Sequence, residues 1–338
     1  VYKRQNVRNA FKWTLLHNGL TAWACYGVVG ISLAYMSYKK GLPLSVRSVL
    51  QPLFGKYLSG GLGHTIDIVA ILATIVGLSV TIGYGVSQFA SGLFNITQFD
   101  WLVGENSQPT IGAQLLGLLL IIGASCLSAM SGLHKGIKWL SNVNMILSLV
   151  LILFFMLFGA SVFAFKTFFI TIYDYLLALP EMSFTVWNSN DSEIIGKLQS
   201  WQSSWTIFYW AWWIAFAPFV GIFLARVSKG RTIREYVFGA IIVPSLICLV
   251  WFAFIGGTAI DLELSGEAQG SIINTDISNQ LFATVNLILS EGFAATLSVI
   301  IVILLLTFLI TSADSGILII NTLASGGSSD RREVKHII

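Results

Sequence analysis

The stretch that most constrains the fold is residues 205–225, WTIFYWAWWIAFAPFVGIFLA, which carries no charged side chain. A helix of about 20 apolar residues is long enough to cross a bilayer. Tryptophans in membrane helices usually lie at the two interfaces, yet Trp210, Trp212 and Trp213 stand near the middle of this run. Pro218 also removes a backbone donor, which is tolerated where neighbouring groups satisfy the freed carbonyl. We therefore expect this helix to face protein or a cavity.

The chain as a whole has the composition of an integral membrane protein. Only 10% of its residues are charged, and its mean hydropathy is +0.79. Hydropathy predicts about seven spans, at residues 14–36, 66–94, 111–131, 143–165, 205–225, 236–260 and 294–311. Acidic segments at 173–200 and 261–292 are expected to connect spans. We predict an all-α, multi-span helical bundle that forms a single transmembrane domain over residues 1–338, incomplete at both ends.

The distribution of basic residues predicts the orientation of these spans. Short cytoplasmic loops carry an excess of Lys and Arg. Most of the 19 basic residues follow the first, third, fifth and seventh spans, which are therefore expected to end in the cytoplasm. They are Lys39, Lys40, Arg47, Lys56, Lys135, Lys138, Arg226, Lys229, Arg231, Arg234, Arg331, Arg332 and Lys335. We expect the four that follow the fifth span to fix the topology and to contact anionic membrane lipids, with a role in a cytoplasmic gate as the alternative.

A second aromatic feature lies in the first span, within HNGLTAWACY at residues 17–26. Trp23 and Tyr26 are three residues apart and so share a helix face. Such a pair alone is more often an interfacial anchor or a packing contact. Together with the tryptophan-rich span, however, it indicates two facing aromatic walls, and ring faces attract cations by about 0.5–2 kcal/mol each. The pattern favours a site for a quaternary ammonium group.

Other chemistry finds little support in the sequence. Cys25, Cys126 and Cys248 lie in separate apolar spans with no metal-ligand spacing, which is typical of packing residues. His64 and Asp67 share a helix face, but HExxH and GxSxG motifs are absent. We expect no enzyme activity and no organic cofactor, and the chain has no basic aromatic surface that would indicate nucleic-acid binding.

Four segments together resemble the betaine/choline/carnitine transporter family over almost the whole chain. They are WTIFYWAWWIAFAPFVGIFLARVSKGRTIREY, KKGLPLSVRSVLQPLFG, GHTIDIVAILATIVG and ITSADSGILIINTLASGG. The resemblance implies a multi-pass transporter of a bacterial-type plasma (inner) membrane, with a five-plus-five inverted-repeat core and usually a homotrimer. It implies that this chain supplies the fourth to tenth of twelve spans. The implied activity is movement of an onium solute of betaine, choline, carnitine or dimethylsulfonium type, by alternating access and sodium-coupled or by exchange.

The resemblance also implies a solute site. Trp23, Tyr26 and Trp213 match the family's tryptophan box, Trp212 flanks it, and Trp210 and Phe208 are aromatic residues of the pathway or packing contacts. Two positions depart from the family pattern, because Asn18 and Phe216 stand where tryptophan is common. Asn18 offers a hydrogen bond but no ring. This departure favours a choline-like, carnitine-like or dimethylsulfonium solute over glycine betaine.

Two sodium sites are implied in the same way. Thr311, Ser312 and the carbonyl of Phe308 match one of them, and oxygen atoms are the natural ligands of hard cations. The alternative for both hydroxyls is hydrogen bonding to the preceding helical turn. The second family site uses Thr74, a threonine one turn later and the ring of Phe219. Because Leu78 replaces that later threonine, the sequence predicts a weakened or missing second site.

Three further polar residues have open roles. Asp314 is either functional, as an acid within the membrane, or hydrated or paired with arginine. The position of Asp67 in the first turn of its predicted helix favours a structural role, because an acid there interacts well with the helix dipole. The position of His17 at the outer end of its predicted span also favours a structural role. The alternatives to a sodium-coupled transporter are a sodium-independent exchanger, a transporter-like solute sensor and an intramembrane enzyme.

Overall fold

The computed structural model describes residues 2–104, 107–130, 133–187 and 191–327. All of the regular elements in these residues are helices, and the one isolated β-bridge found among them joins Val103 and Pro109. The chain divides into two compact units. Unit 1 comprises Val1–Gly77, Phe169–Leu249 and Gly316–Ile338, and unit 2 comprises Leu78–Phe168 and Val250–Ser315. Four helices, α5, α8, α12 and α15, contribute to both units.

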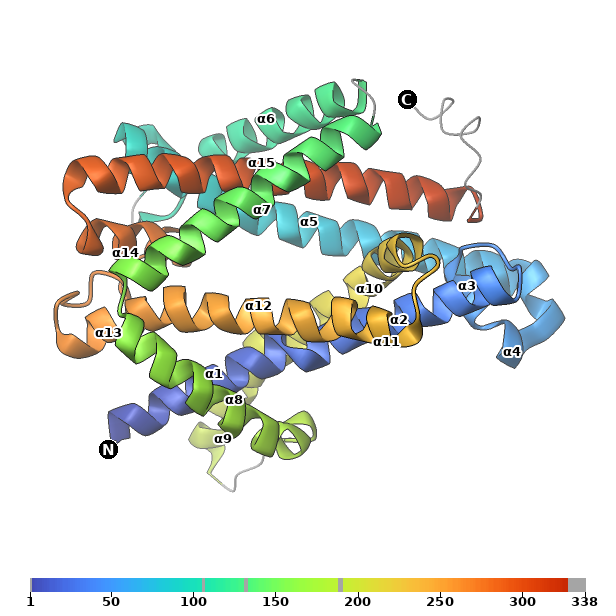
Figure 1. Ribbon diagram of the computed structural model, residues 1–338, viewed down its shortest axis with the longest axis horizontal. Helices are drawn as coiled ribbons and strands as arrows, with labels where there is room; N and C mark the ends of the chain where they lie inside the picture. Colours follow the sequence, from blue (N-terminus) through green and yellow to red (C-terminus); the bar gives the residue numbers. More distant parts are fainter. Residues whose placement is uncertain (1, 105–106, 131–132, 188–190, 328–338) are drawn as a thin grey trace. The chain divides into compact units, whose positions relative to one another are not determined.

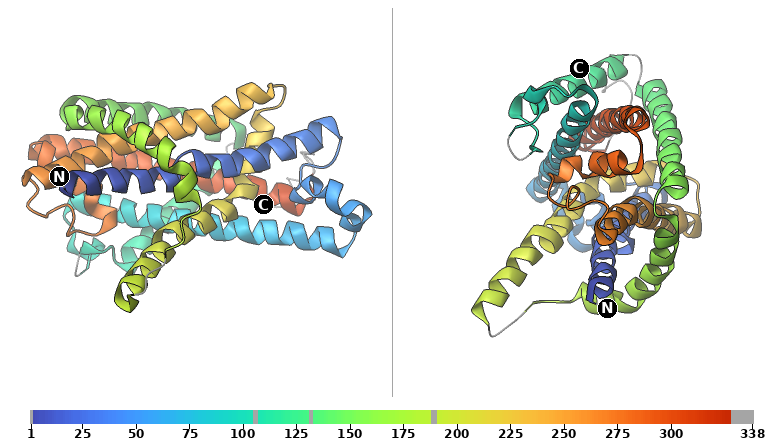
Figure 2. Two further views of the ribbon diagram at one scale, coloured as in Figure 1. Left: turned by 90° about the horizontal axis from the view of Figure 1, so that it is seen from below. Right: turned by 90° about the vertical axis from the view of Figure 1, so that its left-hand side faces the viewer.

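Unit 1 begins with two consecutive helices that run on in nearly the same direction (Figures 1 and 2). Its elements are α1 (Tyr2–Asn18), α2 (Leu20–Ala34), the π-helical turn η1 (Tyr35–Lys39), α3 (Val46–Val49), α4 (Gln51–Phe54), η2 (Gly55–Ser59), the start of α5 (Gly61–Thr97), the end of α8 (Ser161–Ser183), α9 (Ser192–Gln202), η5 (Ser203–Ile207), α10 (Phe208–Val227), α11 (Ile233–Val237), η6 (Phe238–Ile242), most of α12 (Val243–Trp251) and the end of α15 (Glu291–Ala324). Its core gathers Leu33, Ala70, Phe219, Ile222 and Leu323 from four of these helices.

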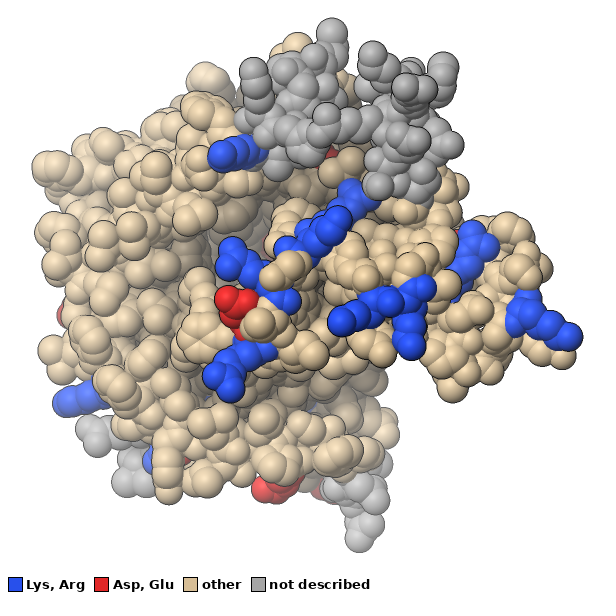
Figure 3. Space-filling model, turned by 45° about the vertical axis from the view of Figure 1, so that its right-hand side comes forward, with Lys and Arg blue, Asp and Glu red and all other residues tan. Residues whose placement is uncertain are grey.

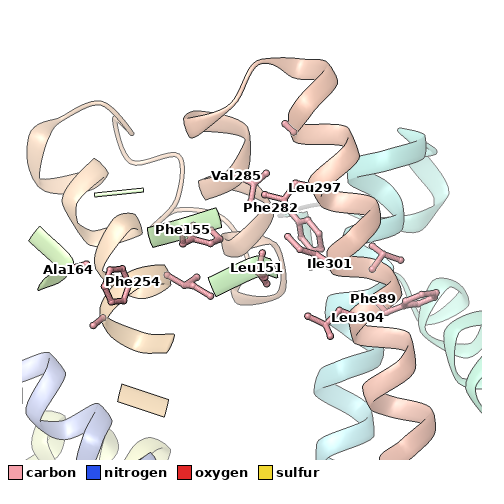
Figure 4. Close-up of a cluster of buried hydrophobic side chains, with 14 residues drawn as sticks. Phe89, Leu151, Phe155, Ala164, Phe254, Phe282, Val285, Leu297, Ile301 and Leu304 are labelled. Carbon is pink, nitrogen blue, oxygen red and sulfur yellow. The ribbon is translucent and has the colours of Figure 1, made fainter. Parts of the chain in front are cut away.

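Unit 2 holds the larger apolar core. Its elements are the rest of α5, η3 (Asp100–Leu102), α6 (Ile111–Met130), α7 (Leu133–Phe158), the start of α8, the end of α12, η7 (Phe252–Gly256), α13 (Gly257–Ser265), η8 (Ile277–Asn279), α14 (Gln280–Ile288) and the first part of α15. Figure 4 shows Phe282 and Val285 of α14 beside Leu297 and Ile301 of α15. Phe155 of α7 belongs to the same cluster and is fully buried.

Seven helical stretches in the described residues are long and apolar enough to cross a membrane. They are Gln5–Lys39, Gly61–Thr97, Lys138–Phe158, Ser161–Ser183, Glu193–Val227, Ile233–Ser265 and Glu291–Ala324. The protein is therefore an all-α, multi-pass integral membrane protein, as the sequence predicted. Ile111–Leu127, one of the predicted spans, is a shorter apolar helix.

The largest difference from the predicted layout lies at residues 143–165, for which one span was expected. Here α7 ends at Phe158 and α8 begins at Ser161. The break is stabilised from another helix, because the backbone N–H of Ala160 donates a hydrogen bond of 3.1 Å to Thr258 Oγ1 of α13. As a result, helix α8 occupies part of the segment 173–200 that was predicted to be a connection, and α9 occupies its end. Hydropathy alone did not detect the break because both sides of it are apolar.

Candidate functional site

The aromatic residues of the first span lie just after a break between α1 and α2. Asn18 ends α1, Gly19 leaves helical geometry with φ −95° and ψ −137°, and Leu20 begins α2. The chain stays bonded across the break, since Gly19 N donates to Leu15 O (2.7 Å) and Trp23 N donates to Gly19 O (3.1 Å). This geometry places Trp23 and Tyr26 in the first two turns of α2.

Helices α2 and α10 pack closely because glycines meet at their contact. A Cβ atom on Gly221 of α10 would lie 2.6 Å from Val29 Cγ1, and one on Gly30 of α2 would lie 3.1 Å from the Gly221 carbonyl oxygen. Small residues allow membrane helices to approach at the backbone. Any larger side chain at Gly221 would therefore push the two helices apart.

This close approach brings together the three predicted box residues, Trp23, Tyr26 and Trp213, which we call the aromatic cluster. The ring centroid of Trp213 lies 4.8 Å from that of Tyr26 and 5.9 Å from that of Trp23. Trp23 and Tyr26 are 5.9 Å apart and nearly perpendicular, at 87°. Edge and face contacts of this kind are the preferred geometries of aromatic pairs. Two helices that are distant in the sequence thus contribute to one cluster of contacting rings inside unit 1.

The other predicted aromatic residues lie in separate groups on α10. Phe208 and Trp212 contact each other at 5.7 Å and also pack on Tyr209. Trp210 faces the residues around His17 and Trp213, while Phe216 packs at 4.9 Å on Phe219.

The amide nitrogen of Asn18 is engaged on its own helix. Its Nδ2 donates to the backbone oxygen of Thr14 on its own helix, at 3.1 Å. The aromatic cluster therefore consists of three of the eight predicted solute residues, and the solute-binding roles of all eight remain predictions.

His17, next to the break, is buried and fully engaged in packing. Its Nε2 lies 3.0 Å from Thr206 Oγ1, and its ring is stacked on Tyr209 with centroids 5.1 Å apart and planes 5° apart. These contacts join the end of α1 to η5 and α10. The contacts favour the structural role that the sequence predicted, but His17 lies within the stretch Gln5–Lys39 and not at the outer end of a span.

A second group of interest lies on α15 in unit 2, at the residues predicted to bind sodium. The Thr311 hydroxyl donates to the carbonyl oxygens of Phe308 (2.9 Å) and Thr307 (3.0 Å). Ser312 is half-buried beside it. Asn144 of α7 adds a fourth group, because its Nδ2 donates to Thr311 Oγ1 at 3.3 Å. We call Thr311, Ser312, Phe308 O and Asn144 the oxygen cluster.

The sequence did not predict a role for Asn144, because a single polar residue in an apolar helix does not indicate which residue it contacts. It is 4% exposed, and among the described residues its Oδ1 has no hydrogen-bond partner. A buried polar atom without a partner is uncommon, because it forfeits its hydration. An amide, a hydroxyl and a carbonyl oxygen form a donor set suited to a hard cation. These residues therefore supply oxygen types that suit sodium, while the atom of Asn144 that faces Thr311 in this structure is the Nδ2 donor.

The second predicted ion site fits less well. Thr74 of α5 is fully buried, and its hydroxyl donates to the carbonyl oxygen of Ala70 at 2.8 Å. Phe219 packs in the same core as Ala70. Leu78 stands one turn after Thr74 and supplies no oxygen. A hard cation needs several oxygen ligands, and one hydroxyl with an aromatic ring does not provide them.

Three charged residues flagged in the sequence make specific contacts. Asp314 is buried and accepts a hydrogen bond from Ser125 Oγ of α6 in unit 2. Asp67 forms an ion pair of 2.7 Å with Arg47, which ties α5 to α3 in unit 1. Arg226, at the end of α10, donates to Thr322 Oγ1 at 2.7 Å.

Comparison with known proteins gives one consistent result. Residues 2–338 match the family model described as BCCT, betaine/carnitine/choline family transporter. A glycine betaine/proline/choline transporter of Vibrio parahaemolyticus is 38% identical over 94% of this chain and 54% of its own length. The glycine betaine transporter OpuD of Bacillus subtilis is 38% identical over 96% of this chain and 60% of its own length. The chain thus spans little more than half the length of these relatives, and its family is one of transporters and not of enzymes. The chain belongs to the betaine/carnitine/choline transporter family.

Proposed function

We propose that the full-length protein is a secondary active transporter of an onium solute and that the aromatic cluster holds the solute's cationic head. The observation that carries this proposal is the meeting of Trp23, Tyr26 and Trp213 from α2 and α10. A cation within about 6 Å of a ring centroid is attracted by the ring face, by about 2 kcal/mol where it is desolvated. Centroids 4.8–5.9 Å apart allow one cation to interact with more than one ring.

The solute's other end needs a polar partner. Trp213 Nε1 is buried, and among the described residues no group accepts its hydrogen. A carboxylate or hydroxyl oxygen on the solute would satisfy this donor, and hydrogen bonds to charged acceptors are the stronger ones. This arrangement supports solutes with an oxygen near the onium centre, such as betaine, carnitine, choline or dimethylsulfoniopropionate. The relatives named as glycine betaine transporters support the same class.

Sodium coupling is the second part of the proposal. Thr311, Ser312, the Phe308 carbonyl and Asn144 would hold the ion, and the inward electrochemical gradient of sodium would drive uptake of the solute. The buried Asn144 Oδ1 supports this assignment, since a cation would satisfy it. Because the Thr74 position lacks a second oxygen, we propose one coupled sodium ion at this group of residues. Transport would proceed by alternating access, in which one helix bundle moves against the rest, within a homotrimer.

The test is uptake by the full-length protein in liposomes with an inward sodium gradient and an imposed membrane potential. Radiolabelled glycine betaine, choline, carnitine and dimethylsulfoniopropionate would be offered separately. We expect saturable uptake of at least one of them, abolished by collapse of the sodium gradient. Failure to take up any of the four under these conditions would overturn the proposal.

One observation favours a sodium-independent exchanger as the second candidate. The Thr311 hydroxyl oxygen already accepts a hydrogen bond from Asn144 Nδ2, and the hydroxyl hydrogen is donated to backbone oxygens of α15. Both hydrogen-bonding functions of this hydroxyl are therefore satisfied without an ion. Counterflow distinguishes the two functions. An exchanger would equilibrate labelled solute in sodium-free buffer at the same rate as in sodium, whereas a symporter would lose most of its uptake.

A further inference from the structure

A groove in unit 1 lies outside both groups of residues described above. It has a volume of about 580 Å³ and runs between the end of α2 with η1 on one side and the segment that enters α11 on the other. Ile31, Met36 and Ile233 form part of an apolar wall. Lys39 and Arg231 line the same groove, together with the hydroxyl-bearing residues Ser228 and Thr232. The groove is therefore amphipathic.

Its charged side is strongly basic. Lys40 Nζ lies 5.9 Å above the ring of Tyr35, and Lys229 Nζ lies 5.5 Å above the ring of Tyr38, and both tyrosines line the groove. Figure 3 shows lysine and arginine side chains gathered on this face, with few acidic ones between them.

One acid of α11, Glu235, does little to neutralise this charge. Glu235 approaches Arg231 only at 4.0 Å. Its carboxylate accepts hydrogen bonds from the backbone N–H and the hydroxyl of Thr232, at 2.8 and 3.1 Å, where it caps α11. An excess of positive charge thus faces the groove.

The groove also lies where a membrane surface would be. One membrane-crossing stretch ends at Lys39 and another begins at Ile233, so both walls are the ends of spans. Ile233 is 67% exposed, which is unfavourable in water and favourable against acyl chains. Basic pockets between membrane helices near the surface are suited to anionic lipid head groups.

We infer that this groove binds one anionic phospholipid, with its phosphate between Lys39 and Arg231 and an acyl chain along Ile31, Met36 and Ile233. The charge complementarity selects an anion, and the exposed apolar wall selects a lipid over a soluble acidic peptide. The sequence predicts that the basic residues after the fifth span contact anionic lipids, and the groove specifies where one such lipid would bind. This lipid site does not depend on which solute is transported.

Two hydrogen bonds connect this groove to the aromatic cluster's helices. The Tyr38 hydroxyl donates to the carbonyl oxygen of Ala225 on α10 at 3.1 Å. The Tyr236 hydroxyl donates to the carbonyl oxygen of Gly27 on α2 at 2.9 Å. A lipid that fixes the groove walls therefore also stabilises the packing of α2 on α10.

The experiment measures retention of phosphatidylglycerol against phosphatidylcholine by the detergent-solubilised full-length protein, using native mass spectrometry. Loss of one basic side chain near a membrane surface weakens anionic lipid binding about fivefold. We expect Arg231→Gln and Lys39→Gln each to lower phosphatidylglycerol retention about fivefold, and the double variant about 25-fold. Arg231→Lys should retain it, and Lys56→Gln, at an exposed lysine outside the groove, should leave it unchanged.

A second readout is the thermal midpoint, which phosphatidylglycerol should raise in the parent protein and in Lys56→Gln but not in the double variant. Equal phosphatidylglycerol retention by the parent and the double variant would overturn the inference. So would displacement of the lipid by a second copy of the chain or by another segment of the full-length protein. Solute uptake in phosphatidylcholine liposomes serves as the separate readout, because absence of uptake by the parent protein itself would contradict the proposed function and not the lipid site.

Discussion

The aromatic cluster of unit 1 and the oxygen cluster of unit 2 are held together by different kinds of contact. In the aromatic cluster, three rings pack against one another with centroids 4.8–5.9 Å apart and without hydrogen bonds between them. In the oxygen cluster, the groups make directional hydrogen bonds, and one buried oxygen, Asn144 Oδ1, is left over among the described residues. The first should therefore be sensitive to helix spacing, and the second to the loss of single atoms.

The largest effect should come from Gly221→Leu. A side chain here overlaps Val29 and separates α2 from α10. Overpacking typically costs about 1–3 kcal/mol, and 3 kcal/mol corresponds to about 100-fold in affinity. We expect onium binding to weaken by about that factor, while the sodium dependence of any residual uptake is unchanged.

Gly239→Leu is the control, since a Cβ there meets nothing within 4 Å. Equal effects of the two variants would show that helix spacing does not determine the aromatic cluster.

Trp213→Leu removes the ring that takes part in two of the three aromatic contacts of the cluster. A desolvated cation–π contact of about 2 kcal/mol corresponds to about 30-fold in the Kd for the solute. The exposed Trp139 of α7 supplies the control, Trp139→Leu. Isothermal titration of the full-length protein would measure both. An unchanged Kd in Trp213→Leu would remove this residue from the site.

Asn144→Ala tests the oxygen cluster by deleting the amide and little else. Loss of one hydrogen-bonding or ligand group of about 1 kcal/mol raises the half-saturating sodium concentration about fivefold. Solute affinity at saturating sodium should stay constant. Thr311→Val is a companion variant, and Thr296→Val is its matched control. The Thr296 hydroxyl also donates a hydrogen bond to its own helix, to Gly292 O at 3.0 Å, but Thr296 is exposed. A half-saturating sodium concentration that is unchanged in Asn144→Ala and Thr311→Val would remove these residues from the ion site, whereas uptake that needs no sodium in the parent protein would argue for the exchanger.

Tyr236→Phe should give the smallest effect. It removes one hydrogen bond to Gly27 O, worth about 1 kcal/mol, and should lower Tm by about 2 °C. Tyr57→Phe, at an exposed tyrosine, should not change Tm. A shift in Tyr57→Phe as large as that in Tyr236→Phe would show that the assay does not report packing of α2.

The two groups of residues also differ in how far the sequence predicted them. Trp23 and Tyr26 could be paired because a spacing of three residues puts them on one helix face, and the tryptophan-rich α10 offered an obvious partner. Asn144 could not be assigned, because its contact with Thr311 depends on how α7 packs against α15. The break at Gly159 was missed for a similar reason, since Thr258, which stabilises it, lies on another helix. Local pattern thus predicts faces of helices, whereas single polar contacts between helices require the structure.

The most direct test of the central claim compares choline with its uncharged carbon isostere, 3,3-dimethylbutan-1-ol, in equilibrium binding to the full-length protein and to Trp213→Leu. The two ligands have nearly the same shape, so they differ in the positive charge that the rings are proposed to recognise. We predict that the parent protein binds the charged ligand at least about tenfold more tightly and that Trp213→Leu loses most of this preference. Equal affinity of the parent protein for both ligands would contradict the account.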